Sequence, residues 1–259
     1  MRGSPLETSL GCVAISIMLW ATQQSLLADE TAGEGPDEAV SPKLVRLSPD
    51  HDVWVDFHRK LVVVDGRVCE RDAALEMFAC TENSKEHESI VTVRAKASII
   101  HTALLAVGAQ RGTPVRFDPV YAPADGPIVE VRVLWTDEEG QRHNERAQSW
   151  IKNVKTGEEL AHEWVFAGSG FWINPDSGER FYHGDGGDFI CVSNFPSATL
   201  DLPIESSQAK ASLTFVPFTE RIPPVDTNVR LVLIPEVKEV EDNPEEARQE
   251  GEAGEINDE

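Results

Sequence analysis

The alternation of side chains over residues 129–135 constrains the fold more than any other pattern in this chain. Val129, Val131, Val133 and Trp135 are apolar, and the positions between them are mostly polar, which is typical of a strand with one buried face. Other short runs rich in β-branched and aromatic residues also predict strands. These runs are 60–64, 67–69, 90–93, 164–166, 171–173, 180–182, 189–192, 213–216 and 229–234.

Two features describe how these strands are connected and covered. Asp65-Gly66 is typical of a type I′ turn and predicts a hairpin between 60–64 and 67–69. An apolar stripe with Ser98 as N-cap and Gly108 as C-terminal stop predicts one helix over 98–107. Residues 73–78 fit a helical turn or a strand equally well. The sequence therefore predicts a β-rich α+β domain, with at least one helix packed on a mostly antiparallel sheet.

The N-terminus has the features of a secretory signal peptide. Arg2 precedes a twelve-residue apolar run over 10–21, which is shorter than the ~20 residues that span a bilayer. We expect a signal peptide over 1–28, with cleavage after Ala28 or, alternatively, after Ala32. The mature protein is then exported and periplasmic or secreted, with no membrane span left after cleavage.

The composition after the signal predicts three further parts. Residues 29–42 have the acidic, small-residue composition of a disordered linker, and 43–235 form one globular domain. Residues 236–259 hold eleven acids and two bases, which predicts a disordered acidic tail. The formal net charge of the chain is −22, so −22 − (−9) = −13 remains outside that tail. Such a surface repels phosphate backbones and anionic lipids and argues against nucleic-acid binding.

Several segments together resemble a known family. They are KEHES (85–89), HTALLAVGA (101–109), WVFAGSGFW (164–172), GDFICVSNF (187–195) and LDLPIESS (200–207). In this order they resemble the YdjY-type domain, and most of all its exported planctomycete-type members, over 53–235. The resemblance implies one folded unit and export, and it assigns no activity. Some members are associated with ferredoxin-like iron–sulfur modules, which implies accessory work in electron transfer, but this chain lacks the cysteines for a cluster.

The residues also suggest a transition-metal site. Cys80, His87, Glu88 and His101 offer thiolate, imidazole and carboxylate ligands, and three of these with a water would form a reactive centre. Against this, His87 and Glu88 are adjacent and on a strand would face opposite sides. In an oxidising compartment Cys69 and Cys80 are also candidates for a disulfide, which would leave Cys80 unable to bind a metal. Cys191 lies in an apolar run and is expected to be buried.

Three other groups of residues are candidates for a functional role. Ser169 lies in AGSG, which lacks the outer glycines of a nucleophile elbow and indicates a tight bend instead. Asp176, Asp185 and Asp188 are oxygen ligands suited to calcium, or solvated carboxylates in glycine-rich turns. The aromatic side chains of the central region are candidates for a ligand cleft, or for the core. These candidates are Trp150, Trp164, Phe171 and Trp172.

Two functional hypotheses follow from the sequence. The first is an exported soluble binding or accessory domain with a protein partner, supporting a redox or cell-surface assembly. The alternative is a metal-dependent or redox enzyme that uses Cys80, His87, Glu88 and His101.

Overall fold

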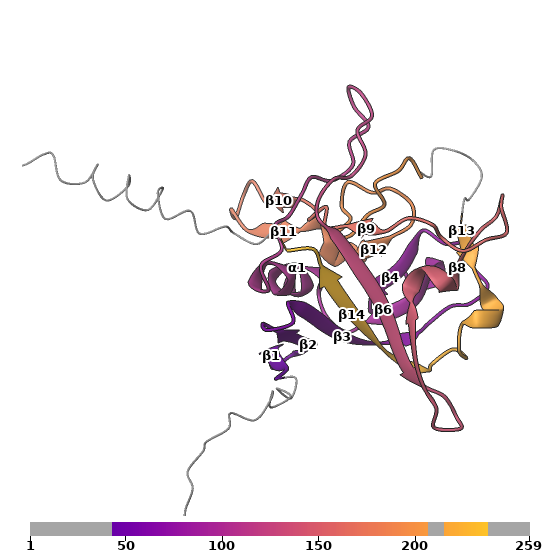
Figure 1. Cartoon of the computed structure of the whole chain (residues 1–259). Coiled ribbons are helices and arrows are strands. Elements are labelled where there is room, and N and C mark those ends of the chain that lie inside the picture. Colours follow the sequence, from indigo (N-terminus) through magenta and orange to yellow (C-terminus); the bar gives the residue numbers. More distant parts are fainter. Residues whose placement is uncertain (1–42, 207–214, 238–259) are drawn as a thin grey trace, which may run out of the picture. The chain divides into compact units, whose positions relative to one another are not determined.

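The computed structural model describes residues 43–206 and 215–237 (Figure 1). The predicted signal peptide and linker lie outside the described residues. So do the predicted tail after Val237 and the first two residues of the predicted strand 213–216.

Ten of the described strands form one large sheet. They are β1 (Val45–Ser48), β2 (His51–Asp56), β3 (Leu61–Val68), β4 (Met77–Thr81), β5 (Ser89–Val93), β6 (Ile128–Thr136), β7 (Arg142–Arg146), β9 (Trp164–Val165), β12 (Ile190–Cys191) and β14 (Asn228–Pro235). Two smaller pairs are β10 (Phe171–Ile173) with β11 (Arg180–Tyr182), and β8 (Ile151–Asn153) with β13 (Phe215–Pro217). The helical elements are α1 (Ala97–Ala106) and the 3₁₀ turns η1 (Glu86–Glu88), η2 (Ala147–Trp150), η3 (His183–Gly186) and η4 (Thr219–Arg221).

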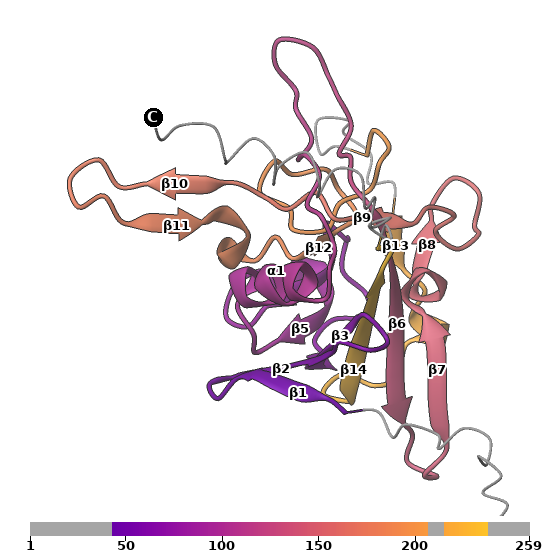
Figure 2. The same ribbon diagram turned by 60° about the vertical axis from the view of Figure 1, so that its left-hand side comes forward.

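The main path of the large sheet runs β12-β4-β5-β3-β14-β6-β7. β2 pairs with β3, β1 with β2, and β9 with β6, and only the β4–β5 pair is parallel. α1 packs against β2 and β3 and so covers one face of the sheet (Figure 2). The predicted β-rich α+β class, with a mostly antiparallel sheet and a packed helix, is confirmed.

The predicted hairpin turn at Asp65-Gly66 is wrong, because β3 continues through both residues. One edge of β3 pairs with β14 over almost its whole length. The other edge pairs first with β2 and then, from Gly66 onward, with β5. A Cβ on Gly66 would lie 2.6 Å from the backbone oxygen of Thr92. The glycine therefore permits a close approach of β5, and no turn is made here.

The N-cap of α1 also differs from the prediction. The helix begins at Ala97 with Lys96 as N-cap, and the side chain of Lys96 makes no capping hydrogen bond. Asp185 of η3 takes that role, since its carboxylate accepts hydrogen bonds from the backbone amide and the hydroxyl of Ser98, both at 2.8 Å. Neither α1 nor any other helix in the described residues combines the length and apolarity needed to cross a membrane.

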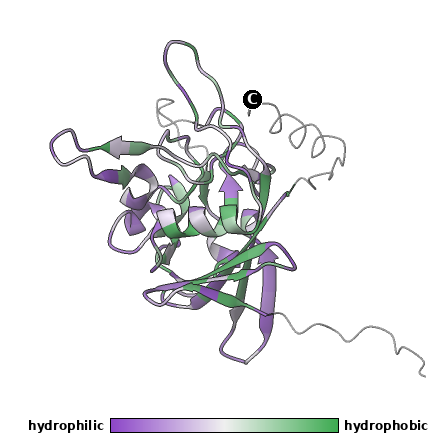
Figure 3. Ribbon diagram, turned by 90° about the vertical axis from the view of Figure 1, so that its left-hand side faces the viewer, coloured by the Kyte–Doolittle hydropathy of each residue, from purple (hydrophilic) through white to green (hydrophobic). Residues whose placement is uncertain are grey.

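The hydrophobic core lies between the sheet and the segments that cover this face. Trp150 and Trp164 are fully buried, and the ring of Phe78 contacts both at centroid distances of 6.3 and 5.7 Å. Cys191 is buried, as predicted, and its carbonyl accepts a 2.7 Å hydrogen bond from the Trp164 indole. The strands of the large sheet carry much of the hydrophobic sequence, whereas the loops are largely hydrophilic (Figure 3).

We predict that Gly66→Ala destabilises the domain by about 1–3 kcal/mol, because the added methyl group collides with the backbone of β5. Gly186→Ala is the matched control, since a Cβ there would meet no atom within 4 Å, and it should change the free energy of unfolding by less than about 0.5 kcal/mol. Urea unfolding of both variants measures the difference. Equal stability of the two variants would show that β5 can move away from β3 at little cost.

Candidate functional site

The structure does not bring the four predicted metal ligands together. His87 lies on η1 with its side chain 77% exposed, near the carboxylate of Glu88. Cys80 is buried in β4, and His101 is buried on α1. Within residues 43–206 and 215–237, no group of three or more His, Cys, Asp or Glu side chains is placed to hold a metal ion.

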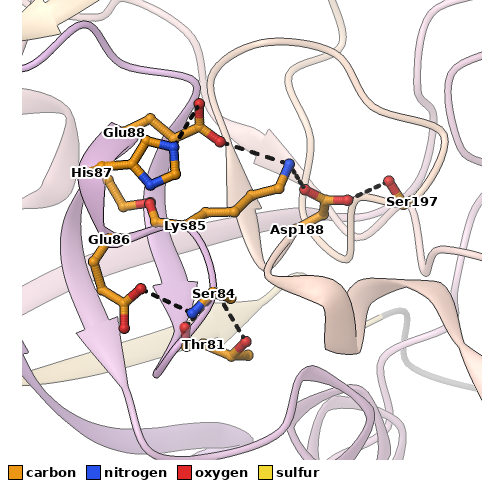
Figure 4. A network of polar contacts seen from close by, with 9 residues as sticks. Thr81, Ser84, Lys85, Glu86, His87, Glu88, Asp188 and Ser197 are labelled. Atoms are coloured by element: carbon orange, nitrogen blue, oxygen red, sulfur yellow. Dashed lines mark hydrogen bonds and ion pairs between the residues drawn. The ribbon is translucent and has the colours of Figure 1, made fainter.

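Lys85 is the centre of a polar cluster at the β4–β5 connection (Figure 4). Its ammonium lies 2.8 Å from Asp188 Oδ1 and 3.7 Å from Glu88 Oε1, and it sits over the ring of Phe195 at 4.6 Å. Ser197 donates a hydrogen bond to the other oxygen of Asp188. Two segments that carry the family resemblance, 85–89 and 187–195, therefore meet at this ion pair.

Two of the titratable groups in this cluster have shifted pKa values. Burial raises the pKa of Glu76, and the neighbouring Glu88 carboxylate raises it further. Burial alone would lower the pKa of Lys85, but Asp188 and Glu88 outweigh it and raise that pKa. The ammonium thus remains charged between Asp188 and Glu88, which indicates that it holds the two segments together.

Cys69 and Cys80 lie in hydrogen-bonding contact and are both thiols in this structure. Cys69 Sγ is also 3.1 Å from the backbone oxygen of Ser89. The hydrogen bond from Cys69, together with contacts to Ser89 and the Lys85 amide, lowers the pKa of Cys80 to about 7, although burial opposes this. The predicted disulfide is not formed in the structure, although the two thiols interact and each shifts the pKa of the other.

His101 belongs to a second buried network. Its Nδ1 is 2.9 Å from the hydroxyl of Tyr182, which is in turn 3.1 Å from the hydroxyl of Thr199. Its ring also contacts Phe166 edge-on. Burial lowers the pKa of His101, and Arg111 lowers it further, so the ring is held neutral. His101 is therefore part of the packing around α1 in this structure.

The other predicted site residues serve separate purposes. Trp150 and Trp164 are fully buried in the core, which is the second of the two interpretations given for the central aromatic residues. Phe171 and Trp172 are exposed on the β10–β11 hairpin. The three aspartates are not gathered either, since Asp185 caps α1, Asp188 binds Lys85, and Asp176 lies exposed in the turn between β10 and β11.

A groove of about 940 Å³ crosses one end of the sheet and is the strongest candidate for a binding site. Most of its charged side chains come from β3, β14, β6, β7 and the residues next to them. The charged lining consists of Asp52, Asp65, Glu82, Asp137, Glu138 and Asp226 with Arg67, Arg94, Arg142, Arg230 and His143. Both signs of charge are therefore present in one concave surface.

Several of these charges form ion pairs within the groove. Arg230 binds both oxygens of Asp65, at 2.6 and 3.0 Å. Arg67 binds Asp226 at 2.9 Å and lies 3.7 Å from Glu82. By contrast, three exposed groups have no ion-pair partner among the described residues. These are Arg94, Arg142 and Glu138.

The aromatic part of the groove is a stacked pair. The rings of Trp135 and His143 lie parallel at 4.6 Å, and the edge of Trp135 meets Trp150 at 5.2 Å. His143 Nε2 is 2.6 Å from Asp137, and this hydrogen bond lowers the pKa of that carboxyl. One face of the Trp135 ring is therefore already covered.

The groove residues were missed by the sequence analysis. Asp65 and Arg67 in β3, and Asn228 and Arg230 in β14, occupy alternate positions between apolar neighbours. That alternation was the available signal for a polar sheet face. The pairing of β3 with β14 places Arg230 opposite Asp65, and strand order is not visible in one sequence.

We predict that wild-type stability falls as pH rises from about 4 to about 8 because of Asp201. This residue is fully buried, and only its Oδ1 accepts hydrogen bonds, from Leu202 N and Asn194, while Oδ2 has no described partner. Burial outweighs those bonds and raises its pKa from 3.8 to about 8. The folded state therefore binds this proton more tightly than the unfolded state does. The resulting stabilisation is fully present below the unfolded pKa and is lost as the pH rises to the folded pKa of about 8.

Urea unfolding at pH 5 and pH 8 measures this effect. Asp201→Asn should reduce the loss of stability between the two pH values by an amount on the order of 3 kcal/mol, because the amide carries no charge to bury. Asp176→Asn, at an exposed position, should leave the loss unchanged. An identical pH dependence in wild type and Asp201→Asn would contradict the assignment.

Comparisons with known proteins identify the family. Neither the curated proteins nor the solved structures contain a match to this chain. The family model of the YdjY domain matches residues 53–234, nearly all of the described fold. The chain belongs to the YdjY domain family.

Proposed function

We propose that this protein is an exported, non-catalytic binding module whose groove holds a peptide segment of another protein. The observation that carries the proposal is a pair of exposed arginines, Arg94 and Arg142, which have no ion-pair partner in the described part of the chain. The other two arginines of the groove are matched by acids. A ligand with carboxylates would form charge-assisted hydrogen bonds with these two guanidinium groups. Glu138 offers the opposite charge to a basic side chain of the same ligand.

The dimensions of the groove suit an extended segment. Its volume of about 940 Å³ lies at the upper end of the usual range for ligand sites. β5, β3, β14, β6 and β7 are successive neighbours in the sheet, so four strand spacings, about 19 Å, separate its two sides. At about 3.3 Å per residue, an extended peptide of roughly six residues crosses this width.

The chemistry of the lining favours a peptide over a glycan. Sugars bind well to open aromatic faces, whereas one face of Trp135 is covered by His143. The remaining lining presents guanidinium and carboxylate groups side by side, which match a chain that carries both acidic and basic residues. The formal charge of −22 disfavours nucleic acids and anionic lipid surfaces.

Export is supported by the N-terminal sequence. Arg2, the apolar run over 10–21 and Ala28 ahead of two acidic residues form the pattern of a cleaved signal. The protein then works in the periplasm or outside the cell. The contact between Cys69 and Cys80 supports oxidation of this pair by the protein disulfide donors of such a compartment.

We predict that the mature protein, isolated unreduced from an exporting host and then denatured, titrates one thiol, and three after reduction. Cys69 and Cys80 would each lose an electron and a proton to the disulfide donor, while Cys191 remains a buried thiol. The variant Cys69→Ser should titrate two thiols under both conditions. Three thiols in the unreduced wild type would contradict the disulfide, and an uncleaved N-terminus in the same sample would contradict export.

The peptide proposal is tested with a displayed library of random twelve-residue peptides, selected on the immobilised mature protein. Enriched peptides should carry both acidic and basic residues. They should bind Arg94→Ala/Arg142→Ala at least about tenfold more weakly, since two charge-assisted hydrogen-bond sites are removed.

The matched control is Arg59→Ala/Arg116→Ala, which removes two exposed arginines outside the groove. Its affinity for the same peptides should equal that of the wild type. A library that yields no enriched peptide, or peptides that bind both double variants equally, would overturn the groove as the binding site.

A further inference from the structure

The β10–β11 hairpin exposes an unusual concentration of large apolar side chains. Phe171, Trp172, Ile173 and Phe181 are 46, 49, 57 and 42% exposed. Trp172 and Phe181 are opposite each other in the register, with ring centroids 5.4 Å apart. Figure 2 shows both strands extending away from α1 and the large sheet.

The base of this hairpin is firmly attached to the domain. The chain enters β10 through a sharp bend in which Gly168 and Ser169 have φ of +83° and +52°. Ser169 Oγ accepts a 3.1 Å hydrogen bond from Gly184 N, and His183 N donates to Gly170 O at 3.0 Å. A buried serine in this sparsely populated conformation shows that the surrounding contacts fix the direction of the hairpin.

No described strand covers the hairpin. β10 and β11 pair only with each other in the described part of the chain, and a two-stranded sheet alone is marginally stable in water. Trp172 and Phe181 share one face, which is apolar. Phe171 and Ile173 point to the other face, where Arg180 lies over the Phe171 ring. A contiguous, protruding apolar surface of this kind marks an interaction site.

The charges on the hairpin distinguish between its candidate occupants. Asp176 and Glu179 lie in the exposed turn beyond the aromatic rows, and neither has an ion-pair partner among the described residues. The third charged residue of the hairpin, Arg180, lies nearer its base with its guanidinium 4.3 Å from the centre of the Phe171 ring, so the turn itself presents only acids. If the hairpin inserted into a membrane, these carboxylates would have to enter the bilayer ahead of the aromatic rings, which is energetically costly. A second copy of this chain would bring its own formal charge of −22 to the contact. A partner protein with basic side chains avoids both the insertion of carboxylates into lipid and the repulsion between two negatively charged chains.

We propose that the β10–β11 hairpin docks into an apolar groove on a partner protein, with basic residues on the rim of that groove. Trp172 and Phe181 fill the apolar part, and the carboxylates of Asp176 and Glu179 meet the basic rim. This surface is separate from the groove that contains Arg94 and Arg142, and it does not depend on the peptide ligand proposed for that groove.

The test uses photo-crosslinking with the full chain. p-Benzoylphenylalanine replaces Trp172 in one sample and the equally exposed Phe57 in another, and each is irradiated in an extract of the source cells. We expect a crosslinked protein from position 172 alone.

That protein is then purified, and its affinity is measured for wild type, Trp172→Ser, Trp172→Ser/Phe181→Ser and Phe57→Ser. Both hairpin variants should keep the wild-type melting temperature and bind at least about tenfold more weakly, whereas Phe57→Ser should bind normally.

Four results would overturn the proposal. The first is the absence of a crosslink specific to position 172, and the second is equal affinity of the purified partner for the hairpin variants and wild type. The third is a crosslinked dimer of this chain. The fourth is sedimentation of the chain with phosphatidylcholine vesicles that is lost in Trp172→Ser. The third would identify self-association, and the fourth a lipid surface. Arg94→Ala/Arg142→Ala should bind the hairpin partner normally, so the failure of either proposal can be recognised independently of the other.

Discussion

The close approach of β5 to β3 at Gly66 is the constraint on which the rest of the sheet depends. β3 pairs with β14 along one edge and exchanges β2 for β5 along the other. At the point of exchange the two backbones lie nearer than a side chain on Gly66 would allow. It brings β5 and β4 into the same sheet as β14, β6 and β7, and so creates the wide polar face in which the groove lies.

The class of the fold could be predicted from the sequence, but its connections could not. The alternation over 129–135 and the apolar stripe of the helix are local patterns, and they predicted β6 and α1 within one or two residues. The Asp65-Gly66 prediction failed because the same dipeptide serves a turn or a close strand contact, and only the position of Thr92 decides between them. Likewise, the carboxylate that caps α1 comes from Asp185, 87 residues away in the chain.

The candidate site was less predictable than the fold for a related reason. His87, Glu88 and Cys80 are close in sequence, yet the turn η1 directs His87 to solvent and β4 buries Cys80. Residues that are close in the sequence are therefore not gathered into one site in the structure. The groove has the opposite character, because Asp65 and Arg230 are 165 residues apart and meet only through strand pairing. An ion pair of that kind has no local sequence signal.

The distribution of satisfied and unsatisfied charges separates structural clusters from binding surfaces in this domain. Asp185 caps a helix and Asp188 clamps Lys85, so both carboxylates of the 183–188 segment are engaged in internal contacts. A ligand that competed for them would have to break the contacts that hold this segment on α1 and the β4–β5 connection. Arg94 and Arg142 have no such engagement among the described residues, and a ligand can bind them without any rearrangement of the fold. The binding that we propose is therefore assigned to the open sheet face and the exposed hairpin, while the polar interior stabilises the scaffold that presents them.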